Sequence, residues 1–333
     1  MNKRRSKKNI VYIILLILLG FFIFWRAAPE HVTYGVSFSK YHAEELKLDW
    51  KKVFLAILDD LHVKNFRLSA HWPNIEPKNG SFNFSDLDFQ VSEVGKRGAS
   101  VILAVGRRLP GWPECHEPEW TWEKNDDEKR ELILSYITKV VERYKNQQAV
   151  KYWQIENEPF LTLYANYYCG TVSNEDFLKK EIALVKKLDP TRKIIITDSG
   201  ELGLWYKAYR NADIFGTSLY LYIWNQYLGP IRYPIPPSFF ALKNALMSTL
   251  YGSKQSFISE LSAEPWLLRP ILETPIEVQL KQMSIERFNK TINFARATGF
   301  DTQYLWGAEW WYYMKQNSHE EFWNAARGVF NKQ

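Results

Sequence analysis

Carboxylate side chains follow apolar runs of this sequence at points where a buried strand would end. The stretch WQIENEPF, residues 153–160, starts as an apolar run and closes in Glu156, Asn157 and Glu158. A second apolar run, SFISE, ends in Glu260, 102 residues (260 − 158) after Glu158. An unpaired charge at the mouth of a buried strand is costly. These carboxylates therefore indicate a solvent-accessible functional site at the ends of the strands.

Sequence patterns for other kinds of chemistry are missing. The chain has no HExxH, no spaced Cys/His cluster, no GxSxG elbow, no GxGxxG and no P-loop. Those patterns would indicate zinc, serine-nucleophile or nucleotide chemistry. We therefore expect no metal and no cofactor, and the carboxylates remain the candidate reactive groups.

Eight β-rich apolar runs alternate with amphipathic stretches from residue 31 onward. The predicted strands are 32–38, 65–70, 100–105, 151–156, 193–198, 214–220, 255–260 and 302–307, and helices are expected at 49–61, 88–98, 126–144, 175–188 and 284–299. This order predicts a (β/α)8 barrel over 27–333. A doubly wound sheet is the main alternative, without a dinucleotide motif to support it. Residues 226–250 are expected to form a long loop and a helix.

Active sites of such barrels lie in the loops that follow the strands. Carboxylates, aromatic rings and an arginine converge on this rim. The candidates for contact with a ligand are Arg67, His71, Trp112, Asn157, Tyr220, Tyr222, Trp306 and Glu309, beside the carboxylates Glu158 and Glu260.

Four of these strand ends together resemble the clan A glycoside hydrolases. That clan carries Asn-Glu at the end of the fourth strand, here Asn157-Glu158 in WQIENEP, and a second Glu at the end of the seventh, here Glu260 in SFISELS. The run FRLSAHWPNIEPKNGSFNFSDLD and the loop LPGWPECHEP are also similar to the clan. The resemblance covers roughly 33–315 and is nearest to families 5, 39 and 42.

The resemblance implies retaining hydrolysis of a glycosidic bond, with the two carboxyl groups about 5–5.5 Å apart. Glu158 would be the acid and later the base, and Glu260 the nucleophile, kept ionised by Arg67. Asn157 would bind a sugar hydroxyl and Trp306 would form an apolar floor. Tyr222 would donate to Glu260, although Tyr220 lies on the same strand face and is hard to separate from it.

Several alternatives stay open at this point. Glu156 could pair with a neighbouring Arg or Lys, and Glu264 competes with Glu260 as nucleophile. A transglycosylase, or a carbohydrate-binding barrel without catalysis, could use the same rim. The abundant aromatic residues favour a β-linked carbohydrate substrate, since flat sugar faces stack on rings. No protein partner can be inferred.

The N-terminus separates from the rest by charge and hydropathy. The formal charge is +6, of which Lys3, Arg4, Arg5, Lys7 and Lys8 supply five, so the remainder is about +1 and a nucleic-acid-binding face is not expected. The apolar run 10–25 follows. We predict a cytoplasmic tail at 1–8, a single-pass signal anchor at 9–26 and a barrel outside the cell membrane. A cleaved signal peptide is the rival interpretation.

The chain has two cysteines, Cys115 and Cys169. They are expected in the loops after the third and fourth strands, which rise from neighbouring points of the rim. In an oxidising location the pair is expected to form a disulfide.

Overall fold

The computed structural model describes residues 28–111, 114–161, 169, 174–225 and 227–331. The predicted segments 1–8 and 9–26, and the candidate Trp112, lie outside them. Among the described helices, none combines the length and the apolar character needed to cross a bilayer.

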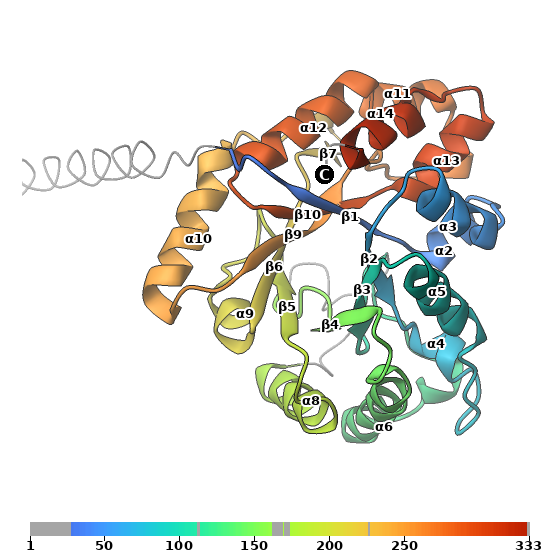
Figure 1. Ribbon diagram of the computed structural model, residues 1–333, viewed down its shortest axis with the longest axis vertical. Helices are drawn as coiled ribbons and strands as arrows, with labels where there is room; N and C mark the ends of the chain where they lie inside the picture. The colour runs from blue at the N-terminus through green and yellow to red at the C-terminus, as the bar shows by residue number, and fades with distance from the viewer. Residues whose placement is uncertain (1–27, 112–113, 162–168, 170–173, 226, 332–333) are drawn as a thin grey trace, which may run out of the picture.

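Eight parallel strands form a closed barrel in the order β1-β10-β9-β6-β5-β4-β3-β2 (Figure 1). Each strand predicted from the sequence is present within two residues of its expected bounds. The barrel strands are β1 (Thr33–Ser37), β2 (Asn65–Ser69), β3 (Ser100–Val105), β4 (Val150–Ile155), β5 (Ile194–Asp198), β6 (Ile214–Leu219), β9 (Ser256–Ser262) and β10 (Thr302–Trp306). The predicted (β/α)8 barrel is therefore confirmed.

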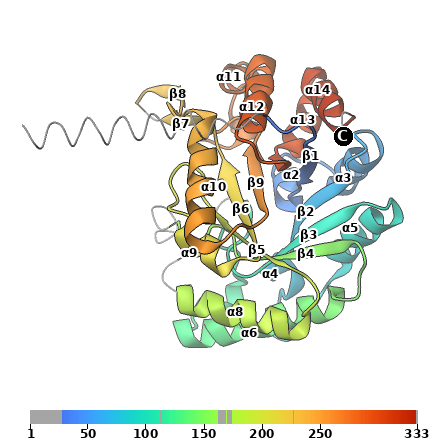
Figure 2. The ribbon, with the colours of Figure 1, turned by 60° about the vertical axis from the view of Figure 1, so that its left-hand side comes forward.

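Helices cover the outside of the barrel (Figure 2). Several begin at a side chain that caps free backbone N–H groups; Asn125 and Glu128 form a capping box at the start of α6. The described helices are α2 (Lys40–Glu45), α3 (Trp50–Asp59), α4 (Trp72–Ile75), α5 (Ser85–Lys96), α6 (Asp126–Tyr144), α8 (Glu175–Leu188), α9 (Tyr206–Asn211), α10 (Pro237–Tyr251), α11 (Ile276–Gln282), α12 (Ile285–Ala297), α13 (Ala308–Gln316) and α14 (Glu321–Phe330).

The connection after β6 differs from the prediction. It forms an antiparallel hairpin of β7 (Tyr222–Asn225) and β8 (Gly229–Arg232) before the expected helix α10. The sequence analysis predicted only a loop here. Pro230 lies opposite Trp224 within the hairpin, and in a two-stranded ribbon each strand is an edge that tolerates a residue without a backbone donor.

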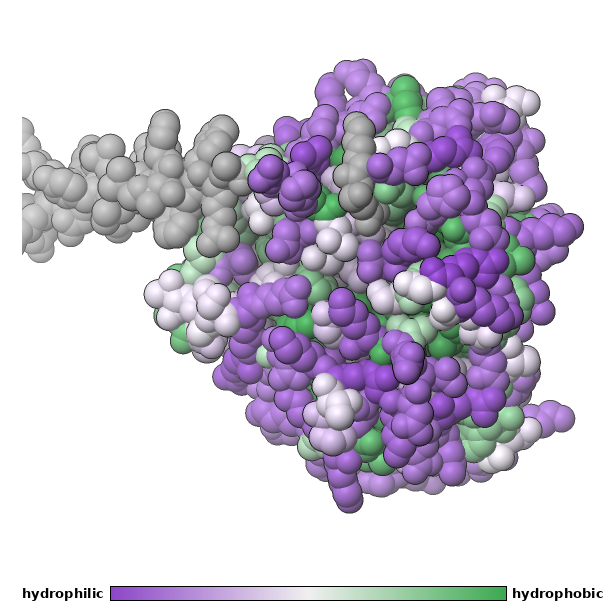
Figure 3. All heavy atoms as spheres, in the orientation of Figure 1, coloured by the Kyte–Doolittle hydropathy of each residue, from purple (hydrophilic) through white to green (hydrophobic). Residues whose placement is uncertain are grey.

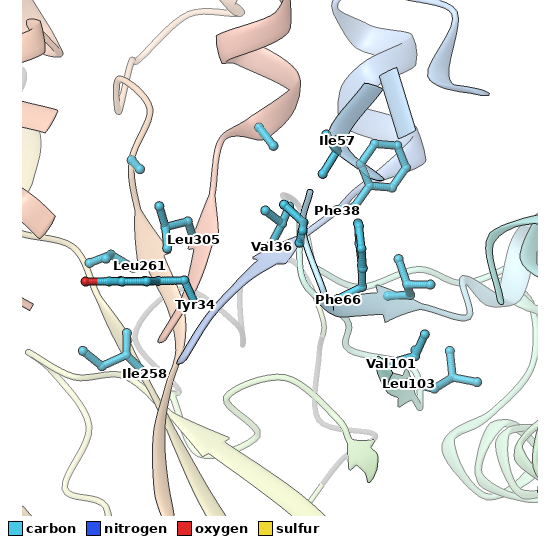
Figure 4. Packing of buried hydrophobic residues seen from close by; sticks show 14 of the residues in the cluster. Tyr34, Val36, Phe38, Ile57, Phe66, Val101, Leu103, Ile258, Leu261 and Leu305 are labelled. Carbon is cyan, nitrogen blue, oxygen red and sulfur yellow. The ribbon is translucent and has the colours of Figure 1, made fainter. Parts of the chain in front are cut away.

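Two sets of buried apolar side chains hold the barrel. The larger lies between the strands and the helices; Val36, Phe38 and Phe66 belong to it (Figure 4). The smaller comprises Ile102, Ile195, Ile214, Phe257 and Tyr304. Partly buried Tyr152 packs against it, two residues before Gln154 on the same face of β4.

Apolar side chains are scattered over the face shown in Figure 3, which is largely hydrophilic. The core therefore lies inside, and the polar groups that are buried within the barrel need a separate explanation.

Candidate active site

Arg67 is the centre of the polar layer inside the barrel. It projects from β2 and is 1% exposed. Its Nη1 donates to Oε2 of Glu260 at 2.6 Å, and its Nη2 donates to Oδ1 of Asn157 at 2.6 Å. Its Nε donates to Oε1 of Gln154 at 2.8 Å. One rigid guanidinium fork thus fixes residues from both β4 and β9.

Glu260, at the end of β9, receives a second strong donor. The hydroxyl of Tyr220 donates to Oε1 of Glu260, while Arg67 occupies Oε2. Burial and the negative charge of Glu260 raise the pKa of Tyr220 well above its ordinary value, so Tyr220 stays a donor. Both carboxylate oxygens accept charge-assisted hydrogen bonds, an arrangement suited to an ionised carboxylate.

The expectation that Tyr222 donates to Glu260 is wrong, because Tyr220 makes that hydrogen bond. β6 ends at Leu219, and the chain turns before Tyr222 enters the β7–β8 hairpin. There the guanidinium of Arg287 lies over the Tyr222 ring, 5.1 Å from its centroid. Tyr220 is held by its backbone N–H, which donates to Glu201 at 2.8 Å.

Glu158 lies in a different environment. Its backbone has a φ of 45°, its N–H donates to Oγ1 of Thr197 at 2.9 Å, and its carbonyl accepts from Arg108 at 2.7 Å. Burial raises the pKa of the Glu158 carboxyl well above its usual range, and the negative charges of Glu114 and Glu260 add to the effect. Glu158 is therefore a carboxyl group that can keep its proton near neutral pH.

Glu156 is a structural clamp. Its two oxygens accept the backbone N–H groups of Arg107 at 2.8 Å and Arg108 at 2.6 Å. Behind it lies the fully buried Glu181 of α8; burial and the charge of Glu156 raise the pKa of Glu181 well above its usual range. The raised pKa favours the protonated form of Glu181 beside Glu156, and Glu156 fixes the β3 loop through the backbone N–H groups of Arg107 and Arg108.

Trp306 ends β10 and is fixed by a polar network. Its indole Nε1 donates to Oε1 of Glu264 at 2.7 Å, and the other oxygen of Glu264 lies 2.8 Å from Nε2 of His42. Glu264 is thus occupied in holding Trp306. Glu309 is fully buried and accepts the backbone N–H of Ser39 at 2.5 Å. Burial raises its pKa to about 7. Because Glu309 exposes no surface, the structure does not place it against a substrate.

His71 is buried among aromatic rings. Its ring centroid lies 4.5 Å from Tyr41 and 4.4 Å from His116. Burial and the neighbouring His116 lower its pKa well below the ordinary value, so the ring is neutral. Within the part of the chain that the structure describes, no hydrogen bond joins His71 to Arg67 or to the carboxylates.

A disulfide joins the loops after β3 and β4. Cys115 and Cys169 are bonded, with their Cα atoms 5.5 Å apart. Glu114 precedes Cys115 and has a φ of 67°. Arg108 donates to Oε2 of Glu114 from Nε at 2.7 Å, and its Nη2 lies 2.5 Å from the same oxygen.

The sequence analysis missed three parts of this site: Gln154, Arg108 as a link, and Glu114. Gln154 had a signal, since it is a polar residue within the apolar run of β4. Glu114 had none, because its position depends on the fold of a long loop.

Comparison with known proteins gives partial sequence matches. The family model described as beta-galactosidase, glycoside hydrolase family 42, matches residues 41–189, which include Arg67 and Glu158 but not Glu260. Endo-1,4-beta-xylanase A of Humicola insolens is 30% identical over 132 residues, 38% of this chain and 33% of the xylanase. Beta-galactosidase BgaA of Clostridium cellulovorans is 24% identical over 177 residues, 45% of this chain and 25% of that enzyme. The matches thus span a third or less of these relatives.

Solved structures share the fold over more of the chain. The beta-glycosidase from Pyrococcus horikoshii has a TM-score of 0.55 at 16% identity and covers 84% of both chains. An endo-beta-1,4-xylanase from Gloeophyllum trabeum has a TM-score of 0.54 at 15% identity and covers 85% of both chains. At such identities the likeness concerns the fold.

Proposed function

The chain is a clan A glycoside hydrolase, and from that premise we propose that it cleaves β-linked O-glycosidic bonds with retention of configuration. Glu158 acts as the acid and base, and Glu260 acts as the nucleophile.

One observation carries the proposal: the two carboxyl groups have opposite environments. Glu260 accepts from the Arg67 guanidinium and the Tyr220 hydroxyl. The Glu158 carboxyl accepts a hydrogen bond from neither of these groups, and burial raises its pKa well above the usual range. Two carboxyl groups whose environments separate their protonation states can supply an acid and a nucleophile in one site.

The reaction then has two displacements. In the first, an oxygen of Glu260 attacks the anomeric carbon while Glu158 gives its proton to the departing glycosidic oxygen, which leaves a glycosyl ester on Glu260. In the second, Glu158 takes a proton from water as that water attacks the same carbon and releases Glu260. Arg67 orients the nucleophile throughout.

Asn157 and Trp306 complete the proposed sugar site. Arg67 holds Oδ1 of Asn157, while the amide Nδ2 is buried and has no hydrogen-bond partner among the described residues. That free donor can serve a sugar hydroxyl near the anomeric carbon. Trp306 offers an apolar face for the sugar ring.

The test is the turnover of a panel of aryl β-glycosides and β-linked polysaccharides. The curated relatives are xylanases and beta-galactosidases, so xylosides and galactosides come first. Glu260→Gln should abolish turnover of every substrate. Glu158→Gln should spare the release of dinitrophenol, which needs no proton, and should lose activity on unactivated glycosides.

Two results would overturn the assignment. Wild-type protein that is folded and inactive on the whole panel would favour a carbohydrate-binding role. A Glu158→Gln variant that is folded yet equally dead on a dinitrophenyl glycoside would remove Glu158 from the role of acid.

We also propose that residues 9–26 anchor the barrel outside the cell membrane. The basic residues before the apolar run 10–25 support this orientation. Protease added to intact cells should degrade the barrel. A barrel that is protected, or that is recovered soluble with an N-terminus near Pro29, would contradict the anchor.

A further inference from the structure

Glu114 is a carboxylate of the site to which the two displacements give no role. It stands on the loop after β3, next to the disulfide of Cys115. Arg108 binds Glu114 through Nε and Nη2 and the backbone carbonyl of Glu158 through Nη1. The Arg108 guanidinium therefore links the Glu114 carboxylate to the backbone segment that carries Glu158.

The loop fixes Glu114 on its other side as well. Its N–H donates to the carbonyl of Gly111 at 2.6 Å, and its carbonyl accepts from Leu109 at 2.8 Å. Arg108 and Cys115 also form an isolated β-bridge. A non-glycine residue at positive φ is strained, and here hydrogen bonds on both sides and the disulfide hold it in that conformation.

The charged groups that face Glu158 come from several elements. They are Glu114 and Arg108 after β3 and Glu260 of β9, and the titratable but neutral hydroxyl of Tyr220 lies after β6. Arg67 of β2 acts on Glu114, and Asp198 of β5 lies in the field of Arg108. The negative charges of Glu114 and Glu260 both raise the pKa of Glu158, in addition to its burial.

We propose that Glu114 is a positioning residue of the active site: through Arg108 it fixes the segment that carries Glu158, and with Glu260 it places a second negative charge beside Glu158, so that Glu158 enters the reaction as an acid. This inference rests on the proposed function, in which Glu158 is the acid. A nearby negative charge disfavours the ionised form of a carboxyl group. Glu114 need not touch the substrate.

Glu114→Gln separates charge from structure, because glutamine can still accept from Arg108 but carries no charge. With the best aryl glycoside, the alkaline limb of the kcat/KM profile should move to lower pH in Glu114→Gln. Glu114→Asp, which keeps the charge, should restore the wild-type limb. Glu119→Gln removes an exposed carboxylate from the same loop and should leave the limb unchanged.

A second measurement keeps the test independent of turnover. Carbon-13 NMR of labelled glutamate, with the Glu158 signal assigned from Glu158→Gln, reports the titration of that carboxyl directly. Its midpoint should fall in Glu114→Gln and not in Glu119→Gln. An unchanged midpoint in folded Glu114→Gln overturns the inference even if the wild type is active. An inactive wild type with a shifted midpoint overturns only the proposed function.

Discussion

Arg67 Nη1 lies 2.6 Å from Oε2 of Glu260, and both side chains are buried inside the barrel. The same guanidinium binds Asn157 and Gln154. The contact therefore does more than neutralise one charge, because it sets the relative positions of the ends of β4 and β9.

Removing Arg67 should destabilise the fold. In Arg67→Met the Glu260 carboxylate stays buried without its cation, and breaking a buried pair in this way costs about 3–5 kcal/mol. Urea unfolding measures the loss. The double variant Arg67→Met/Glu260→Gln should recover part of it. Arg269→Met, at an exposed position, is the control. A single variant as stable as the wild type would contradict the central place of Arg67.

Tyr220 and Tyr222 should respond differently to loss of the hydroxyl. A hydrogen bond to a charged group contributes about 1.5–3 kcal/mol, so Tyr220→Phe should lower kcat/KM roughly 10- to 100-fold. Tyr222→Phe should leave it nearly unchanged, since that ring lies under Arg287. Steady-state kinetics on one aryl glycoside compares the two. Equal losses would show that the hairpin takes part in the site.

The Glu156–Glu181 pair should make stability fall at rising pH. The folded chain holds the proton of Glu181 more tightly than the unfolded chain, where a glutamate titrates near pH 4.3. Its stabilisation is complete below that pH and is lost as the pH rises through the folded pKa.

Urea unfolding at about pH 5 and about pH 8 tests this dependence. The wild type should be less stable at the higher pH, and Glu181→Gln should lose less between the two conditions. Glu131→Gln, at an exposed position of α6, should behave as the wild type does. An identical pH dependence in Glu181→Gln and the wild type would rule out a raised pKa of Glu181.

The disulfide should stabilise the β3 and β4 loops. It closes a segment of 54 residues, for which the chain-entropy model gives about 4 kcal/mol as an upper value. Cys115→Ser/Cys169→Ser should unfold at lower urea concentration than the oxidised wild type. Reduced wild type is the control and should match the double variant. Two thiols titrated in unreduced, unfolded protein would contradict the bond.

The barrel was predictable because its parallel strands are buried on both sides and stand out as continuous apolar runs. The hairpin β7–β8 was not, since its two strands have only four residues each and Pro230 lies within the second. The sequence analysis also assigned the hydrogen bond to Glu260 to Tyr222 instead of Tyr220, because it did not locate the end of β6. Strand alternation puts both on one face only if β6 continues, and the chain turns after Leu219. Glu309 follows β10 in the first turn of α13, and its position in the sequence does not indicate its complete burial.

Trapping of the covalent intermediate tests the central claim most directly. A 2-deoxy-2-fluoro glycoside with an activated leaving group slows the second displacement more than the first and lets the glycosyl-enzyme accumulate. Peptide mass spectrometry should find one sugar on Glu260, and none in Glu260→Gln. A sugar on Glu264 or on Glu158, or turnover that proceeds with inversion and leaves no adduct, would contradict the account.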